Sequence, residues 1–168
     1  MKDIAIFQKE LLNLLYREGA KLVGVANLES VPNAALPIGI SVVIPLPAQI
    51  IGMVEEYPTQ AYYDTYLSYN HQLDHIVRVG EMYLRKNGFD ALANTTTVIH
   101  TDKNYCTPLP HKTVATLAGL GWIGKNCLLV TPEFGSAVRI SSLLTNAPFH
   151  CGEPFLESQC GACSICVQ

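Results

Sequence analysis

The sequence predicts an α/β (α+β) fold, in which helices flank a layered sheet. Short runs rich in β-branched residues alternate with stretches whose apolar residues recur every three or four positions. The chain has 168 residues, of which 49% are hydrophobic, and this is enough for one domain with a sizeable core. Alternating strands and helices favour a sheet that is covered by helices.

The N-terminal elements follow from these two periodicities. Residues 4–15 show helical spacing of apolar side chains, and Gly19 is a natural stop. Residues 21–26 and 38–44 are short β-branched runs that are separated by a proline-containing loop, so we expect two strands.

A long helix is expected next, over residues 59–87, with a possible break near Asn70 and an end at Gly88. Its tyrosines suit a half-buried helix face, the wall of a flat cofactor pocket or the interface of a homodimer. The remaining expected elements are a strand at 95–101, a helix at 113–118, and strands at 128–130 and 138–144.

Charge and hydropathy exclude several classes of protein. The net charge is −3 and the basic residues are scattered, so strong binding of nucleic acid is not expected for this piece. No run reaches the roughly 18 to 20 apolar residues that span a bilayer, and no leader pattern opens the chain. We therefore expect a cytoplasmic protein without membrane contact, in which the six cysteines do not form disulfides.

Three cysteines near the C-terminus, Cys160, Cys163 and Cys166, are separated by two residues each. Soft thiolates at this spacing reach adjacent corners of an iron–sulfur cluster, and Gly161 gives the loop backbone freedom. Zinc is the nearest alternative, with Cys151 or His150 as a fourth ligand, although zinc sites usually pair their cysteines two and two. Buried thiols without a metal fit poorly in such a polar segment.

The fourth ligand of a cluster is not part of this loop, because only two residues follow Cys166. Either Cys151 supplies the fourth ligand, or the chain is truncated within a longer natural protein.

A second motif is rich in glycine. Gly119, Gly121 and Gly124 surround the single tryptophan, Trp122, and the pair Lys125 and Asn126 follows. The spacing matches neither a phosphate-binding loop nor a dinucleotide fingerprint. From the residues alone, a tight turn between a helix and a strand, with Trp122 packed inward, is favoured.

With both motifs in view, the chain resembles the epoxyqueuosine reductase family, whose members are corrinoid and iron–sulfur proteins related to reductive dehalogenases. The resemblance rests on five segments whose order and separation make the match specific. They are residues 108–112, 118–126, 131–136, 143–145 and the cysteine run at 160–166.

The resemblance implies a nitroreductase-like cobalamin-binding domain at residues 1–146 and the beginning of a 4Fe–4S ferredoxin-like segment at 147–168. Electrons would pass from clusters to cobalamin, with flavin as an alternative cofactor. The residues expected at the cofactor are Lys112, Gly119, Gly121, Trp122, Gly124, Lys125 and Asn126.

The chain departs from the family pattern at the expected proton donor. Tyr105 stands where tRNA-acting members carry Asp, and His111 replaces a Glu. Tyr105 is therefore the candidate acid, with Asp102 or His111 as substitutes. Cys106 and Cys127 are interpreted as packed residues of the interior.

These observations lead to a hypothesis of an iron–sulfur reductase that takes electrons from a donor protein or a small-molecule reductant and acts on a small-molecule substrate. Two alternatives stay open at this point: a non-enzymatic corrinoid or flavin electron carrier, and a nitroreductase-like domain with a structural zinc tail.

Overall fold

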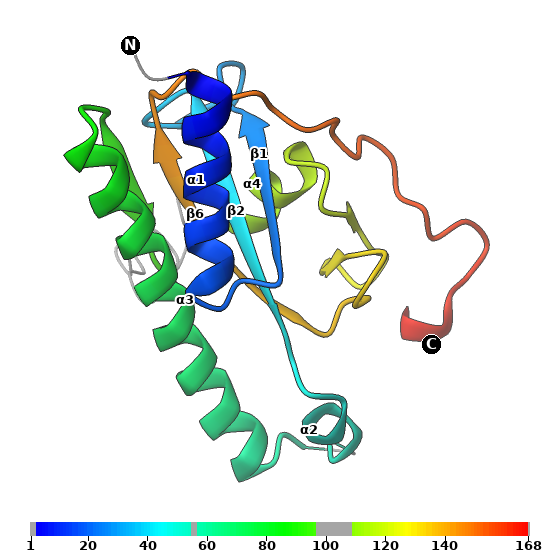
Figure 1. Cartoon of the computed structure of the whole chain (residues 1–168). Helices are drawn as coiled ribbons and strands as arrows, with labels where there is room; N and C mark the ends of the chain where they lie inside the picture. The colour runs from blue at the N-terminus through cyan, green and yellow to red at the C-terminus, as the bar shows by residue number, and fades with distance from the viewer. Residues whose placement is uncertain (1–2, 55–56, 97–108, 168) are drawn as a thin grey trace.

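The computed structural model describes residues 3–54, 57–96 and 109–167. Its centre is a four-stranded antiparallel sheet in the order β1-β2-β6-β3, with helices on both faces (Figure 1). The α/β (α+β) class with flanking helices is thus confirmed. The elements are α1 (Ile4–Arg17), β1 (Leu22–Asn27), β2 (Ile38–Pro45), α2 (Ala48–Gly52), α3 (Gln60–Lys86), β3 (Ala91–Asn94), α4 (His111–Leu117), β4 (Trp122–Ile123), β5 (Leu129–Val130), β6 (Val138–Thr145) and the 3-10 turn η2 (Ile165–Val167).

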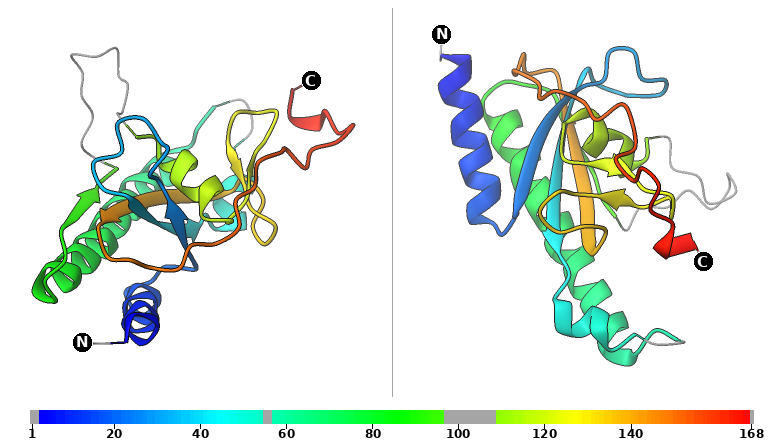
Figure 2. Two further views of the ribbon diagram at one scale, coloured as in Figure 1. Left: turned by 90° about the horizontal axis from the view of Figure 1, so that it is seen from above. Right: turned by 90° about the vertical axis from the view of Figure 1, so that its right-hand side faces the viewer.

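Helices α1 and α3 cover one face of the sheet, and α4 covers the other (Figure 2). The face under α1 and α3 holds the larger core, in which Phe7 stacks on Tyr83 and Phe89. On the opposite face Val114 of α4 packs near Leu144. Strand β2 is therefore buried on both sides, which explains its nearly continuous apolar sequence. In β6, residues 141–145 are buried as well.

Local sequence signals fix the helix ends. Asp3 caps α1, since its carboxylate accepts a hydrogen bond from the backbone N–H of Ala5 at 2.9 Å. The hydroxyl of Thr59 accepts from the N–H of Tyr62 at 3.2 Å and begins α3 in the same way. Gly88, at φ +88°, follows the end of α3.

The long helix expected over residues 59–87 is confirmed as α3, and it has no break at Asn70, because the Asn70 side chain accepts hydrogen bonds from Arg139 and does not compete for the helix backbone. Strand β3, at Ala91–Asn94, was not predicted, and it pairs with β6. The strand expected at 95–101 is tested only at its first two positions. Residues 95 and 96 are not strand, and the rest of that range lies outside the described residues.

Strands β4 and β5 form a separate two-stranded sheet, with Trp122 opposite Val130. This hairpin stands beside the main sheet (Figure 2). The glycine-rich segment therefore lies between helix α4 and a strand, as the residues alone suggested.

The C-terminal segment runs along the outside of the domain as an extended chain (Figure 1). Ala147 and Phe149 still belong to the main core. Beyond them, the N–H of Gly152 donates to the carbonyl of Val25 and that of Phe155 to the carbonyl of Thr116. The two-domain boundary at residue 146 stays a prediction.

Among the described residues, no helix combines the length and the apolar character that a crossing of the bilayer requires.

Candidate functional site: a cavity at the open edge of β6

The described part of the chain contains a cavity of about 570 Å³. It lies where β3 ends: the last β3 pair joins Asn94 to Ser142, whereas among the described residues Val138 to Ser141 pair only with β2. We call this part of β6, which the described residues pair on one side only, its open edge. The lining consists of Leu46, Ile51, Tyr62, Thr96, Pro110, His111, Lys112, Cys127, Leu128, Leu129, Ser136, Ala137, Val138, Arg139 and Ile140.

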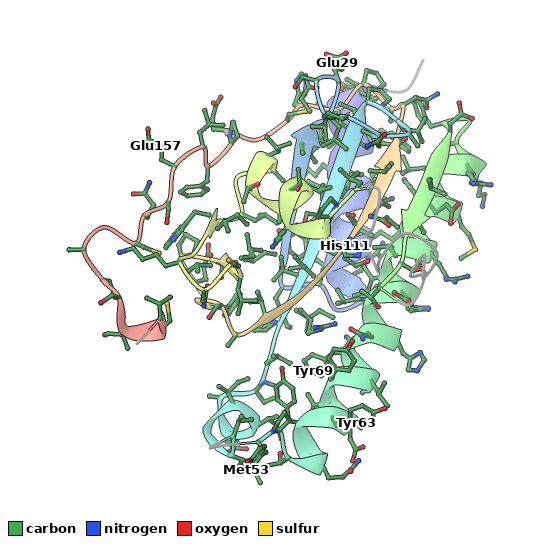
Figure 3. All side chains as sticks on the ribbon, turned by 180° about the vertical axis from the view of Figure 1, so that it is seen from behind. Glu29, Met53, Tyr63, Tyr69, His111 and Glu157 are labelled. Atoms are coloured by element: carbon green, nitrogen blue, oxygen red, sulfur yellow. The ribbon has the colours of Figure 1, made fainter. Side chains whose placement is uncertain are left out.

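His111 begins α4 and reaches the cavity from the α4 face (Figure 3). Its Nδ1 lies 2.9 Å from the hydroxyl of Ser142 and 3.5 Å from the amide nitrogen of Asn94. Because both groups can donate, we assign Nδ1 as the acceptor and place the proton on Nε2. The imidazole is therefore oriented by two side chains from the sheet.

Burial lowers the pKa of His111 from 6.5 to about 4. The carboxylate of Asp74 opposes this shift, and the charge of Arg139 adds to it. His111 is consequently neutral near pH 7. Asp74 itself is buried and accepts hydrogen bonds from the backbone N–H and the hydroxyl of Thr96, at 2.7 and 2.9 Å, which places Thr96 on the cavity wall.

Two cations line the cavity. Lys112 follows His111, and its ammonium donates to the carbonyl of Cys127 at 3.0 Å. Arg139 comes from β6, donates to the side-chain oxygen of Asn70, and lies 4.3 Å from the centroid of the Tyr66 ring. Sequence reasoning missed Arg139, although a single charged residue inside an expected strand was a usable signal.

The glycines of the second motif are explained by packing against the chain itself. A Cβ on Gly119 would lie 2.5 Å from the carbonyl oxygen of Glu153, and one on Gly121 would overlap the carbonyl oxygen of Val130. At Gly124 the same space holds the side chains of Asn126 and Val130. The contact of this segment with a cofactor stays a prediction.

Lys125 and Trp122 join the hairpin to the cysteine loop. The ammonium of Lys125 donates to the carbonyls of Gly161 and Cys163, at 2.9 and 2.7 Å. The Trp122 ring packs at 5.9 Å from that of Phe155, and its buried indole N–H has no hydrogen-bond partner among the described residues. Trp122 is half-buried, so its expected inward packing is met in part.

The three cysteines of the terminal motif are free thiols on an open loop. The backbone N–H of Cys163 donates to the carbonyl of Cys160 at 3.0 Å. The pKa of the Cys160 thiol is lowered, first by the hydroxyl of Ser158, then by the indole of Trp122 and then by Lys125. The indole N–H of Trp122 nevertheless lies outside hydrogen-bond geometry. Within the described residues, no three His, Cys, Asp or Glu side chains gather closely enough to hold a metal ion.

Cys127 corrects a further expectation. We interpreted it as a core residue, but it is exposed, adopts φ +62° and lines the cavity. Cys127 and Lys125 both lie in the turn between β4 and β5, so this turn lines the cavity through Cys127 and is bonded to the cysteine loop through Lys125.

The candidate acids Tyr105 and Asp102, and also Cys106, lie outside the described residues. Of the proposed site residues, His111 and Lys112 meet at the cavity, whereas Trp122 and Lys125 meet the cysteine loop. The homodimer interface expected from the tyrosines stays a prediction. Tyr63 and Met53 are exposed where α3 and α2 project from the domain (Figure 3).

Comparisons with known proteins agree with this architecture. No family model matches the chain. Over 59 residues it is 48% identical to an epoxyqueuosine reductase of Bacillus anthracis, a match that covers 35% of this chain and 15% of that protein. An epoxyqueuosine reductase of Synechococcus sp. (strain CC9605) is 49% identical over 61 residues, which cover 36% of this chain and 19% of that one.

Solved structures extend the similarity to nearly the whole fold. A catabolic reductive dehalogenase in complex with 3-bromo-4-hydroxybenzoic acid matches with a TM-score of 0.77 at 16% identity, over 91% of this chain and 23% of that one. An epoxyqueuosine reductase with a modified tRNA stem loop matches with a TM-score of 0.64 at 18% identity, over 96% and 50%. The chain thus spans about half or less of these relatives. The resemblance to epoxyqueuosine reductases is therefore confirmed, by sequence over about a third of the chain and by fold over nearly all of it.

Proposed function

We propose that this chain belongs to an iron–sulfur reductase that resembles epoxyqueuosine reductase and reduces a small-molecule substrate through a corrinoid. The sequence match to epoxyqueuosine reductases is the observation that carries the proposal. A fold neighbour whose structure "suggests a mechanism for B12-dependent dehalogenation" supports the choice of corrinoid over flavin. An electron-donor protein or a small-molecule reductant is the partner that such a reaction needs.

The cysteine loop has the donor chemistry that a 4Fe–4S cluster requires. Cys160, Cys163 and Cys166 would be its ligands, with a fourth ligand from elsewhere. The lowered pKa of the Cys160 thiol favours the thiolate that binds iron. The positive charge of Lys125, bonded to two carbonyls of the loop, stabilises further negative charge there. Bound iron–sulfur clusters supply single electrons.

The cavity at the open edge of β6 is the place where we expect the corrinoid and the substrate to meet. Its volume of about 570 Å³ lies in the usual range for small-molecule sites. His111 would donate a hydrogen bond from Nε2, because its low pKa leaves it neutral. Tyr105 and Asp102 remain the proposed proton donors, and nucleic acid is not the substrate that we propose.

Metal loading tests the proposal most directly. After oxygen-free loading with iron and sulfide, this chain, or a longer polypeptide that contains it, should show broad absorption at about 400 nm from thiolate-to-iron charge transfer. Cys163→Ser should lose most of that absorption and of the bound iron. Cys127→Ser, altered at an exposed thiol of the cavity, should retain both.

Two outcomes would contradict the proposal. A colourless preparation that contains only zinc would favour the structural zinc tail. Absence of iron and sulfide in the loaded, longer polypeptide would remove the cluster altogether. A protein that only carries electrons and catalyses no reaction would instead bind iron and sulfide normally but would transfer no protons to any substrate.

A further inference from the structure

The cavity carries two cations that have no carboxylate partner among the described residues. The ion pairs among the described residues lie elsewhere and join His75 of α3 to Glu18, the C-cap of α1, and Arg85 to Glu81, both of α3. Asp74, a buried carboxylate nearby, is bonded to Thr96, and no ion pair within 4.0 Å joins it to Arg139 in the described structure.

Among the residues that the structure describes, neutral groups hold Arg139 in place. Its Nε and Nη2 both donate to the Asn70 side-chain oxygen, and the Tyr66 ring stacks against the guanidinium. A guanidinium has five N–H donors, so this geometry leaves donors for another acceptor. Arg85 shows the contrast, since it bonds both Glu81 and the carbonyl of Ala91.

Arg139 is partly buried, and no described carboxylate lies within 4.0 Å of its guanidinium, so a bound anion would lower the cost of burying this charge. Lys112 adds a second positive charge at the same cavity, the buried carboxylate of Asp74 acts on His111 from nearby, and His111 itself is neutral. The remaining lining is mainly apolar, with Leu46, Ile51, Leu128, Leu129, Val138 and Ile140 among its residues.

We propose that this cavity binds a small organic anion, with its carboxylate or phosphate on Arg139 and Lys112 and its apolar body against the aliphatic wall. A guanidinium fork matches both anions through paired hydrogen bonds. The role of the bound anion, as a substrate or as the tail of a cofactor, rests on the proposed function. The binding itself requires neither iron nor a corrinoid.

Isothermal titration calorimetry of the metal-free chain tests the inference, with benzoate, phenyl phosphate and the neutral isostere benzamide as probes. At least one anion should bind about tenfold or more tightly than benzamide. Arg139→Gln should abolish this preference. Arg78→Gln removes the same charge from an exposed position on α3 outside the cavity and should preserve it.

The comparison of benzoate with phenyl phosphate shows which anion the site prefers. Equal binding of anions and benzamide, or an unchanged preference in Arg139→Gln, would overturn the inference. If Arg139→Gln does not fold, the NMR signal of the Arg139 Nε–H in the unmodified chain decides, because titration with the anion should shift it and benzamide should not. Absence of any anion preference in the unmodified chain, together with normal iron loading, would refute this inference and leave the proposed function standing.

Discussion

At the scale of single residues, the structure shows contacts within the protein for side chains that the family resemblance placed at a cofactor. The glycines of residues 118–126 are required by the chain's own backbone, because Gly119 and Gly121 face carbonyl oxygens of other segments. Lys125 is bonded to the cysteine loop, whereas Arg139, which no motif marked, faces the cavity. The motifs marked Gly119, Gly121 and Lys125 but not Arg139, and they did not give the contacts that any of these residues makes within the protein.

Gly121→Ala should lower the free energy of unfolding by about 1–3 kcal/mol, the usual range for overpacking. Its φ of +158° and the overlap of a Cβ with the Val130 carbonyl both disfavour a side chain. Urea denaturation measures the change, and Gly52→Ala is the control, because that Cβ meets no atom within 4 Å. A Gly121→Ala protein as stable as the unmodified one would show that the hairpin adapts freely.

At the scale of elements, strong periodicity was sufficient for α1, β1, β2 and β6. It failed at β3, a four-residue strand whose sequence, Ala-Leu-Ala-Asn, is not β-branched. Pairing with β6 and the buried Ala91 make it a strand, so its cause is tertiary. Asn70 likewise sits in an unbroken helix because Arg139 of β6 binds its side chain.

The link between the β4–β5 hairpin and the cysteine loop should depend on Lys125. Lys125→Gln removes both hydrogen bonds from the ammonium, so amide hydrogen exchange in residues 160–167 should become faster. Lys21→Gln, at an exposed lysine before β1, should leave that exchange unchanged. Equal exchange in both variants would mean that Trp122 and Phe155 alone hold the loop.

At the scale of the whole molecule, the protonation of His111 makes the free energy of unfolding depend on pH. It lies between α4 and the sheet, and its pKa falls from 6.5 in the unfolded chain to about 4. The unfolded chain therefore binds more protons in this window, and the free energy of unfolding falls as the pH drops from 6.5 towards 4. Above pH 6.5 this contribution is constant.

Comparison of urea denaturation at pH 7 and pH 4.5 should show this effect. His111→Asn, which can keep a hydrogen bond to Ser142, should lose about 2 kcal/mol less than the unmodified chain on acidification. His71→Asn changes an exposed histidine of α3 and serves as the control. An identical loss in the unmodified chain and His111→Asn would contradict the low pKa.

The sequence by itself determined the layered fold, most helices and strands, the cysteine motif and the likeness to epoxyqueuosine reductases. These depend on spacing along one chain, which a sequence records directly. Only the tertiary structure decided that β3 lies at Ala91–Asn94, that a cavity lies beside β6, and that Arg139, His111 and Cys127 line it. Those features arise from contacts between residues far apart in the chain, and their energies depend on burial and charge that no local pattern encodes.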